Sequence, residues 1–332
     1  MTEQINWGII GCGDVTEVKS GPAFNKIDRS KLVAVMRRNA DKAADYARRH
    51  NVPKWYANAD ELINDPEVNA IYIATPPSTH AAYTLAALHA RKPVYVEKPM
   101  ATNAAEARQM FNYAMSHNVK LCVAHYRRMQ PMFLRIKSLI DAGAIGDIRF
   151  VQLQLLQSQS ANLIARSEEN WRTDPALSGG GLFHDLAPHQ IDLMLYLFGA
   201  VKQYSGSSFN QTNTSRADDL VSGSIFFENS VLFNGIWCFA VSGQDETDAC
   251  TIYGAKGTIR FGFFGHKLWV TIDGQTELLE FEPLQHVEQP MIEEVVAYFL
   301  GHGENPCDGA VGTEVMEIID AFTANNTSGL GL

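Results

Sequence analysis

Short apolar runs alternate with segments of helical periodicity over the first 125 residues. The runs, expected to be buried strands, are residues 5–10, 32–36, 69–74, 93–97 and 119–124. Apolar side chains at the spacing of one helix face mark residues 40–51, 78–90 and 103–118. Alternation of strand and helix is typical of a parallel sheet covered by helices on both faces. With right-handed crossovers, it predicts a doubly wound α/β domain over residues 1–124.

The pattern changes after residue 125. We expect a helix near residues 130–141, and beyond it apolar and polar residues alternate with a period of two. The alternating segments are residues 148–157, 220–228, 230–241, 250–255, 258–264, 267–273 and 276–282. They predict an α+β domain over residues 125–332 with a large open, mainly antiparallel sheet. A long loop is expected at residues 158–181, and a helical segment begins at Gln289.

Charge and cysteine usage narrow the class of protein. The net charge of -10 is spread along 332 residues without a basic block, so we expect no nucleic-acid partner. The five cysteines stand far apart and form no CxxC pair, which favours a reducing cytoplasm over a disulfide framework or a zinc motif. Neither a signal peptide nor a membrane span is apparent, so we expect no membrane partner.

A glycine loop follows the first predicted strand. Gly11 and Gly13 allow a tight turn and a close approach of the backbone to a pyrophosphate, although Thr16 replaces the third glycine of the usual fingerprint. The loop predicts a dinucleotide-binding Rossmann domain; the alternative is an ordinary turn between strand and helix. The residues expected to bind the cofactor here are Gly11, Cys12, Gly13, Asp14 and Val15.

The second predicted strand ends without an acidic residue. A site for NAD favours a carboxylate there, whereas this chain has Arg37 and Arg38. Guanidinium groups can bind a 2′-phosphate, so we expect NADP, with NAD as the possible alternative. In the competing interpretation, both arginines are solvated at the start of a helix that Asn39 caps.

The sequence ATPPSTH at residues 74–80 ends another predicted strand. Pro76 and its neighbour stop that strand at the edge of the sheet where open α/β folds bind ligands. We therefore expect Thr75 and Pro76 to contact the cofactor. His80 is a further candidate, and the alternative for it is a histidine on the surface of a helix.

Four polar residues cluster in the run GGGLFHDLAPHQID. On a helix, Asp185 and His189 share one face with Asp192, while His184 points about 100° away from Asp185. One helix cannot direct all four groups at one ion, so we expect no metal. Pro188 is best tolerated in a first turn, which predicts that the helix begins near Asp185. We expect His184 to support its neighbours and Asp192 to be structural.

The order of these motifs resembles the glucose-fructose oxidoreductase, inositol dehydrogenase and rhizopine catabolism (Gfo/Idh/MocA) family. Its marks are the GxG loop, the 74–80 segment, the EKP sequence at residues 97–99, and the DxxxH spacing of Asp185 and His189. The resemblance implies a Rossmann domain followed by a domain whose sheet often forms the oligomer interface. It also implies hydride transfer to or from a sugar or cyclic polyol.

For the site, the resemblance implies that Lys98 and His189 meet at the substrate carbinol, with Asp185 in support and Glu97 beside the cofactor. The chemistry agrees, because oxidation of an alcohol requires removal of its hydroxyl proton. A histidine is suited to this task, and so is a partly desolvated lysine. The alternative for Lys98 is a solvated lysine at the end of a strand.

Three more residues are candidates for a substrate wall. Arg127 could face hydroxyl groups, and Trp171 and Arg172 could lie against a sugar ring. Surface or interdomain packing is the alternative for each of them. The sequence thus predicts an NADP-preferring oxidoreductase for a sugar, cyclic polyol or related diol or ketone, assembled as a homodimer or homotetramer. The alternative is a non-catalytic regulator that senses a dinucleotide or sugar, against which intact Lys98, Asp185 and His189 argue.

Overall fold

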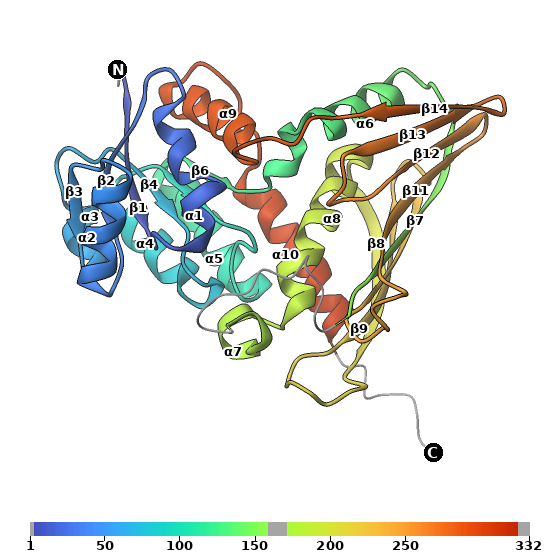
Figure 1. Cartoon of the computed structure of the whole chain (residues 1–332), viewed down its shortest axis with the longest axis horizontal. Coiled ribbons are helices and arrows are strands. Elements are labelled where there is room, and N and C mark those ends of the chain that lie inside the picture. Colours follow the sequence, from blue (N-terminus) through green and yellow to red (C-terminus); the bar gives the residue numbers. More distant parts are fainter. Residues whose placement is uncertain (1–2, 159–170, 325–332) are drawn as a thin grey trace. The chain divides into compact units, whose positions relative to one another are not determined.

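The computed structural model describes residues 3–158 and 171–324, and it divides the chain into two compact units (Figure 1). The first unit comprises Met1–Gln130 and Leu284–Met316, and the second comprises Pro131–Pro283 and Glu317–Leu332. This grouping differs from the expected division into residues 1–124 and 125–332. The difference arises because a helix near the C-terminus packs on the first sheet, where the ring of Phe299 lies 5.6 Å from that of Trp7.

The first unit contains a six-stranded parallel sheet in the order β3-β2-β1-β4-β5-β6, which confirms the doubly wound prediction. Its strands are β1 Ile5–Ile10, β2 Ser30–Met36, β3 Lys54–Tyr56, β4 Ala70–Ile73, β5 Val94–Val96 and β6 Leu121–Val123. Five of them lie on predicted apolar runs. The sixth, β3, is three residues long and occupies an edge of the sheet, where a strand requires little apolar sequence.

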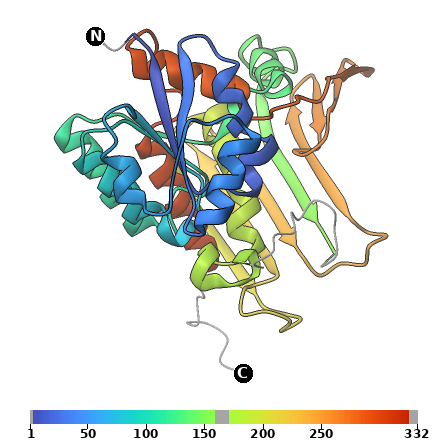
Figure 2. The same ribbon diagram turned by 60° about the vertical axis from the view of Figure 1, so that its left-hand side comes forward.

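Helices lie on both faces of this sheet (Figure 2). They are α1 Asp14–Val18, η1 Gly21–Asn25, α2 Ala40–Arg49, α3 Ala59–Ile63, η2 Pro77–Thr79, α4 His80–His89, α5 Ala104–His117, η3 Tyr126–Met129 and α9 Gln289–Leu300. Asparagine caps begin α2 and α5, since Asn39 accepts from the amide of Lys42 and Asn103 from that of Glu106, each at 3.0 Å. Asn39 therefore caps α2, as the competing interpretation of Arg37 and Arg38 proposed.

The second unit contains an eight-stranded sheet in the order β14-β13-β12-β11-β7-β10-β9-β8. Its strands are β7 Ile148–Leu156, β8 Val201–Phe209, β9 Leu220–Phe227, β10 Leu232–Cys238, β11 Thr247–Gly254, β12 Gly257–Phe261, β13 Lys267–Ile272 and β14 Gln275–Glu280. Every pair is antiparallel except β7 with β10, so the prediction of an open, mainly antiparallel sheet is confirmed. One strand, β8, was not predicted, because its residues are mostly polar.

Helices pack on one face of the second sheet. They are α6 Pro131–Asp141, α8 Leu182–Phe198 and the second half of α10 Gly309–Thr323. The short helices η4 Trp171–Thr173 and α7 Pro175–Ser178 contact α8. The ring of Trp237 lies 5.1 Å from that of Phe183 on α8 and 6.2 Å from that of Phe322 on α10. Half of the long loop expected at residues 158–181, residues 159–170, lies outside the described residues, and the described remainder contains η4 and α7. Among the described helices, none is both long enough and apolar enough to cross a membrane.

Candidate active site

The residues predicted to bind the cofactor gather at one edge of the first sheet. All six strands are parallel, so the segments that follow them emerge at the same carboxyl edge. These segments contain residues 11–15 after β1, 37–38 after β2, 75–76 after β4, 97–98 after β5 and Arg127 after β6. Open sheets of this kind bind their ligands outside this edge.

The glycine loop after β1 has room for a pyrophosphate. Gly11 has a φ of +97°, and a Cβ there would lie 2.8 Å from the amide nitrogen of Thr75, so only glycine fits this turn. Among the described residues, a Cβ on Gly13 would meet nothing closer than 3.9 Å, so these residues leave the surface above it open. The amides of Asp14 and Val15, in the first turn of α1, have no acceptor within the helix. This loop therefore fits a dinucleotide.

Cys12 is part of the loop, but its thiol faces the interior. The side chain is completely buried, and burial raises its pKa to about 12. The thiol therefore stays protonated and packs as an apolar group.

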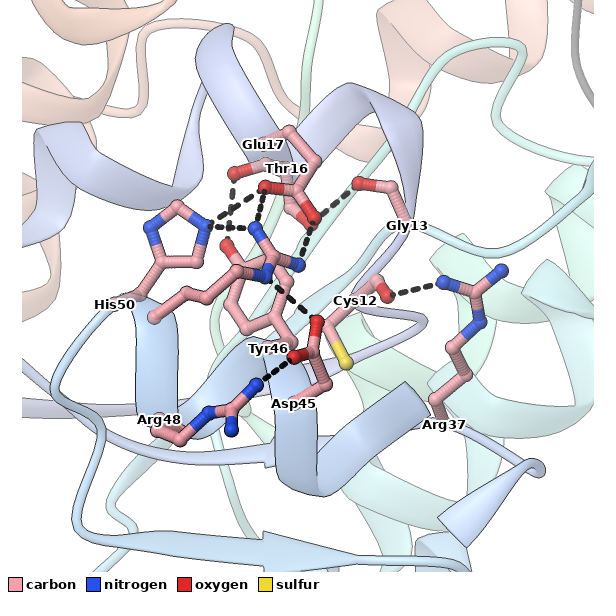
Figure 3. Close-up of polar contacts among 10 residues, drawn as sticks. Cys12, Gly13, Thr16, Glu17, Arg37, Asp45, Tyr46, Arg48 and His50 are labelled. Carbon is pink, nitrogen blue, oxygen red and sulfur yellow. Dashed lines mark hydrogen bonds and ion pairs between the residues drawn. The ribbon is translucent and has the colours of Figure 1, made fainter. Parts of the chain in front are cut away.

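Thr16 takes the place of the third glycine by joining the loop to its neighbours (Figure 3). Its hydroxyl donates to the carbonyl of Gly13 at 2.8 Å, and the hydroxyl of Tyr46 donates to the carbonyl of Thr16 at 2.8 Å. A Cβ on Gly21 would lie 2.2 Å from that carbonyl oxygen, so the close approach has moved to Gly21. The imperfect fingerprint thus reflects a different packing of α1.

An ion-pair cluster fixes α1 to α2 beside the loop (Figure 3). Arg49 contacts Glu17 and Asp45, each at 2.7 Å, and His50 lies 2.8 Å from Glu17. The hydrogen bond from Arg49 lowers the pKa of Glu17 below its usual range. This cluster was not predicted, because Glu17 is 28 to 33 residues from the other three members and meets them only after folding.

The two arginines after β2 differ in their surroundings. Arg37 is half-buried, and its Nη1 donates to the carbonyl of Cys12 at 3.4 Å (Figure 3), whereas Arg38 is exposed. Arg37 thus lies against the glycine loop. The end of β2 carries no carboxylate that could accept hydrogen bonds from a ribose.

His80 connects the loops that follow β4 and β5. Its ring is completely buried, with Nδ1 2.9 Å from the carbonyl oxygen of Pro99 and Nε2 2.7 Å from that of Thr75. The alternative of a histidine on a helix surface is therefore wrong. Burial lowers the pKa of the ring. Both nitrogens face carbonyl groups, so His80 holds the two loops together; direct contact with the cofactor stays a prediction.

Glu97 and Lys98 are adjacent in the chain but differ in how deeply their side chains are buried. The carboxyl group of Glu97 is buried, where Oε1 accepts from the hydroxyl of Tyr72 at 2.6 Å and Oε2 from the amide of Lys98 at 3.2 Å. Lys98 is half-buried and is followed by a cis peptide bond to Pro99. The Glu97 carboxyl group makes its hydrogen bonds inside the first unit, so Lys98 is the candidate catalytic residue of this pair.

In the second unit, Asp185 and His189 lie one turn apart on α8. The expectation that this helix begins near Asp185 is wrong, because it begins at Leu182 and includes Pro188 in its second turn. The reason is that Phe183 in the first turn is completely buried and packs on the sheet, which stabilises the earlier start. His189 is also buried.

Three glycines shape the start of α8. Gly179 and Gly181 have φ values of +91° and +84°, and a Cβ on Gly181 would lie 2.3 Å from that of Ala217. A Cβ on Gly180 would lie 2.0 Å from Cε1 of His184. The His184 ring therefore occupies the space that Gly180 leaves. Burial lowers its pKa to about 4, so the ring is neutral at neutral pH.

Arg172, one of the residues predicted to line the substrate, contacts a candidate catalytic residue. Its Nε donates to Oδ2 of Asp185 at 3.0 Å, with the two side chains 9% and 12% exposed. The guanidinium also stacks on Trp171, 4.4 Å from the ring centroid. Arg172 therefore orients Asp185, a role that the sequence analysis missed. Asp192 is buried, and its structural role stays a prediction; Arg127 is buried with its Nη1 3.4 Å from Oε1 of Gln130.

Comparison with known proteins identifies the class that this fold and site define. Residues 5–125 match an oxidoreductase family with an NAD-binding Rossmann fold, and residues 133–260 match the GFO/IDH/MocA C-terminal domain. The chain belongs to the Gfo/Idh/MocA family of NAD-binding oxidoreductases, as its motifs indicated.

Particular relatives narrow the comparison. Oxidoreductase P35 of Formosa agariphila is 48% identical over 97% of this chain and 99% of its own. Trans-1,2-dihydrobenzene-1,2-diol dehydrogenase of Mus musculus is 31% identical over 84% of this chain and 80% of its own. The solved structure of levoglucosan dehydrogenase with NADH and levoglucosan has a TM-score of 0.84 at 23% identity, and the match covers 96% of each chain. This last likeness supports the fold.

Proposed function

We propose that the protein is an NADP-preferring dehydrogenase or reductase that acts on CH–OH groups of a sugar, cyclic polyol or related diol. The observation that carries this proposal is the edge of the first sheet, where the open glycine loop follows β1, Arg37 follows β2 and Lys98 follows β5. Relatives named as dehydrogenases of a dihydrodiol and of levoglucosan share the family or the fold, and both names describe oxidation of a ring alcohol.

The preference for NADP rests on Arg37 and Arg38. A 2′-phosphate carries charge that guanidinium groups bind well, and Arg37 already lies beside the loop that fits the pyrophosphate. The nicotinamide, when bound, accepts or gives the hydride. The loop amides and the arginines bind and orient the dinucleotide at the sheet edge.

Lys98, His189 and Asp185 handle the proton in this proposal. Lys98 takes the hydroxyl proton when the alcohol is oxidised and returns it when the carbonyl is reduced. His189 hydrogen-bonds the same oxygen, and Asp185, which Arg172 orients, supports the histidine. Arg127 and Trp171 contribute to binding of the substrate hydroxyl groups and ring.

The decisive experiment is a substrate screen followed at the nicotinamide absorbance with NADP and NAD in parallel. Turnover of at least one sugar, cyclic polyol or dihydrodiol is expected, and Lys98→Met should reduce kcat by about 10²- to 10⁴-fold. Lys31→Met, which changes an exposed lysine, is the matched control. If the protein binds NADPH but turns over nothing, and Lys98→Met leaves its biological effect unchanged, it is a regulator instead.

The cofactor preference has its own test. Arg37→Ala with Arg38→Ala should raise KM for NADP by about 10- to 100-fold, because each charge-assisted hydrogen bond contributes about 1.5–3 kcal/mol. KM for NAD should change little. A wild-type enzyme that prefers NAD would contradict this part of the proposal.

We also propose that the protein is a cytoplasmic homodimer or homotetramer that associates through the outer face of the second sheet. This face exposes Phe150 on β7, Phe209 on β8 and Leu278 on β14, with 37%, 53% and 45% of their surfaces accessible. All five cysteines are free, as suits a reducing compartment. Light scattering should report a smaller species for Phe150→Lys and no change for Leu177→Lys, which alters an exposed residue of α7. A monomeric wild type would contradict the assembly.

A further inference from the structure

A second polar cluster lies inside the first unit, behind the strand ends that carry the candidate site. The hydroxyl of Tyr72 lies 2.6 Å from Oε1 of Glu97, 3.2 Å from Oε2 of Glu288 and 3.1 Å from Oγ of Ser20. Glu97 is 5% exposed, and the other three residues are completely buried. The two carboxyl groups also hydrogen-bond to each other.

The cluster joins four segments of the chain, of which one contributes Ser20 before η1. Tyr72 is on β4, Glu97 follows β5, and Glu288 immediately precedes α9. Glu288 occupies the N-cap position of α9 but makes no capping hydrogen bond. Its side chain turns instead toward Tyr72 and Glu97, although a helix N-terminus would favour its negative charge. The folded chain therefore places a second carboxyl group directly against the first.

Two buried carboxyl groups in contact cannot both be ionised at moderate cost. Burial raises the pKa of Glu288 well above its usual range, and the negative charge of Glu97 raises it further. Burial also raises the pKa of Glu97, but the charge of Lys98 and the hydrogen bond from Tyr72 oppose that rise. A proton held between the two carboxyl groups would relieve this cost, and the cation of Lys98 favours the charge on Glu97.

The charged and titratable groups around this pair come from every neighbouring segment. They are Lys19 after α1, Tyr72 on β4, Tyr95 on β5, and Lys98 after β5. The two cations stabilise the charge on Glu97. Tyr95 is completely buried, and its hydroxyl has no hydrogen-bond partner among the described residues.

We propose that Glu288 is a positioning residue that acts on Lys98 through Glu97. In its protonated form it donates to Glu97 and, together with Tyr72, fixes a single carboxylate directly behind Lys98, whose amide donates to Oε2 of that carboxylate. A second negative charge would hold the Lys98 ammonium protonated, and a lost charge would release its proton too easily. The shared proton thus leaves one negative charge behind Lys98, so that Lys98 can both release a proton and take one up. This inference rests on the proposed function of Lys98.

The proton on Glu288 can be observed without any substrate. An infrared spectrum of the whole protein at pH 8 should show the carbonyl stretch of a protonated carboxylic acid, because exposed carboxyl groups are ionised there. The band should be absent in Glu288→Gln and retained in Glu294→Gln, which changes an exposed residue of α9. A wild-type spectrum without the band, or a band that persists in Glu288→Gln, overturns the inference even if the enzyme is active.

The effect on Lys98 is tested by the pH dependence of kcat/KM for alcohol oxidation. Glu97→Gln removes the charge behind Lys98, so the apparent pKa on the acid side should fall by about one unit. Glu288→Ala should lower kcat by about tenfold. It should also shift the same apparent pKa downward, because Glu97 loses the hydrogen-bond donor that stabilises its negative charge behind Lys98. Glu288→Gln keeps an N–H donor without a charge, so it should restore most of the wild-type kcat and most of the wild-type apparent pKa.

The outcomes separate the two proposals. Profiles of Glu97→Gln and Glu288→Ala that superimpose on that of the wild type would overturn the positioning role while leaving the enzyme intact. A protein that shows the infrared band but oxidises no alcohol would instead contradict the proposed function. If Glu288→Ala fails to fold, the comparison of Glu97→Gln with Glu294→Gln still decides the role of the charge.

Discussion

Gly180→Ala tests the packing at the start of the helix that carries Asp185 and His189. The new Cβ would lie 2.0 Å from Cε1 and 2.2 Å from Nδ1 of His184, whereas carbon atoms in contact are separated by about 3.5 Å. The ring would have to move by about 1.5 Å, and it is buried, so it cannot turn into solvent. Overpacking of this kind costs about 1–3 kcal/mol, which corresponds to a fall in melting temperature of roughly 3–10 °C.

Thermal unfolding of the variant should be compared with that of Gly243→Ala. Gly243 is in the same unit, has no neighbour within 4 Å of the new Cβ, and should change the melting temperature little. In a His184→Ala background the ring is gone, so Gly180→Ala should cost almost nothing there. Equal melting temperatures for the two glycine variants, or an unchanged cost without the ring, would show that His184 does not occupy this space.

Three further predictions concern stability. The free energy of unfolding should fall by roughly 3 kcal/mol between pH 6.5 and pH 4, because unfolded His184 takes up a proton that the buried ring, with its pKa lowered to about 4, does not. Urea titrations should show that the free energy of unfolding depends less on pH in His184→Gln than in the wild type. Above pH 7 the two proteins should show the same pH dependence. Arg172→Gln leaves Asp185 without its cation in a largely buried place and should cost about 2–3 kcal/mol in the same assay. Tyr46→Phe leaves the buried carbonyl of Thr16 without this donor and should cost about 1 kcal/mol, and an unchanged stability would refute that role.

Most of the fold could be predicted because buried strands need continuous or alternating apolar residues. The two strands that escaped detection, β3 and β8, are both edge strands. An edge strand makes hydrogen bonds on one side only and borders solvent, so β3 needs only three residues and β8 tolerates a polar sequence. The sequence could not mark them, because backbone pairing with a neighbour defines them.

The residues of the candidate site likewise divide into those that the sequence marks and those that only the folded structure reveals. The motifs after the strands located the glycine loop and Lys98, since a chemical role at a strand end leaves a local signal. The partners of these residues leave none: Arg172 contacts Asp185, and Glu288 contacts Glu97 across 191 residues of sequence. Those contacts exist only after tertiary folding. The start of α8 was misplaced for a similar reason, because burial of Phe183 outweighs the local preference of Pro188.

The return of residues 284–316 to the first unit has a consequence for the order in which the protein is made. Trp7 packs against Phe299, so the core of the first unit includes a side chain that is synthesised near the end of the chain. At about 5–20 residues per second, a ribosome spends roughly 10–30 s on residues 131–283, which lie between the two parts of the first unit. During that time the sheet of the second unit can form, while the first unit still lacks α9. Although its strands are made first, the nucleotide-binding unit cannot be completed until residues 284–316 have been synthesised.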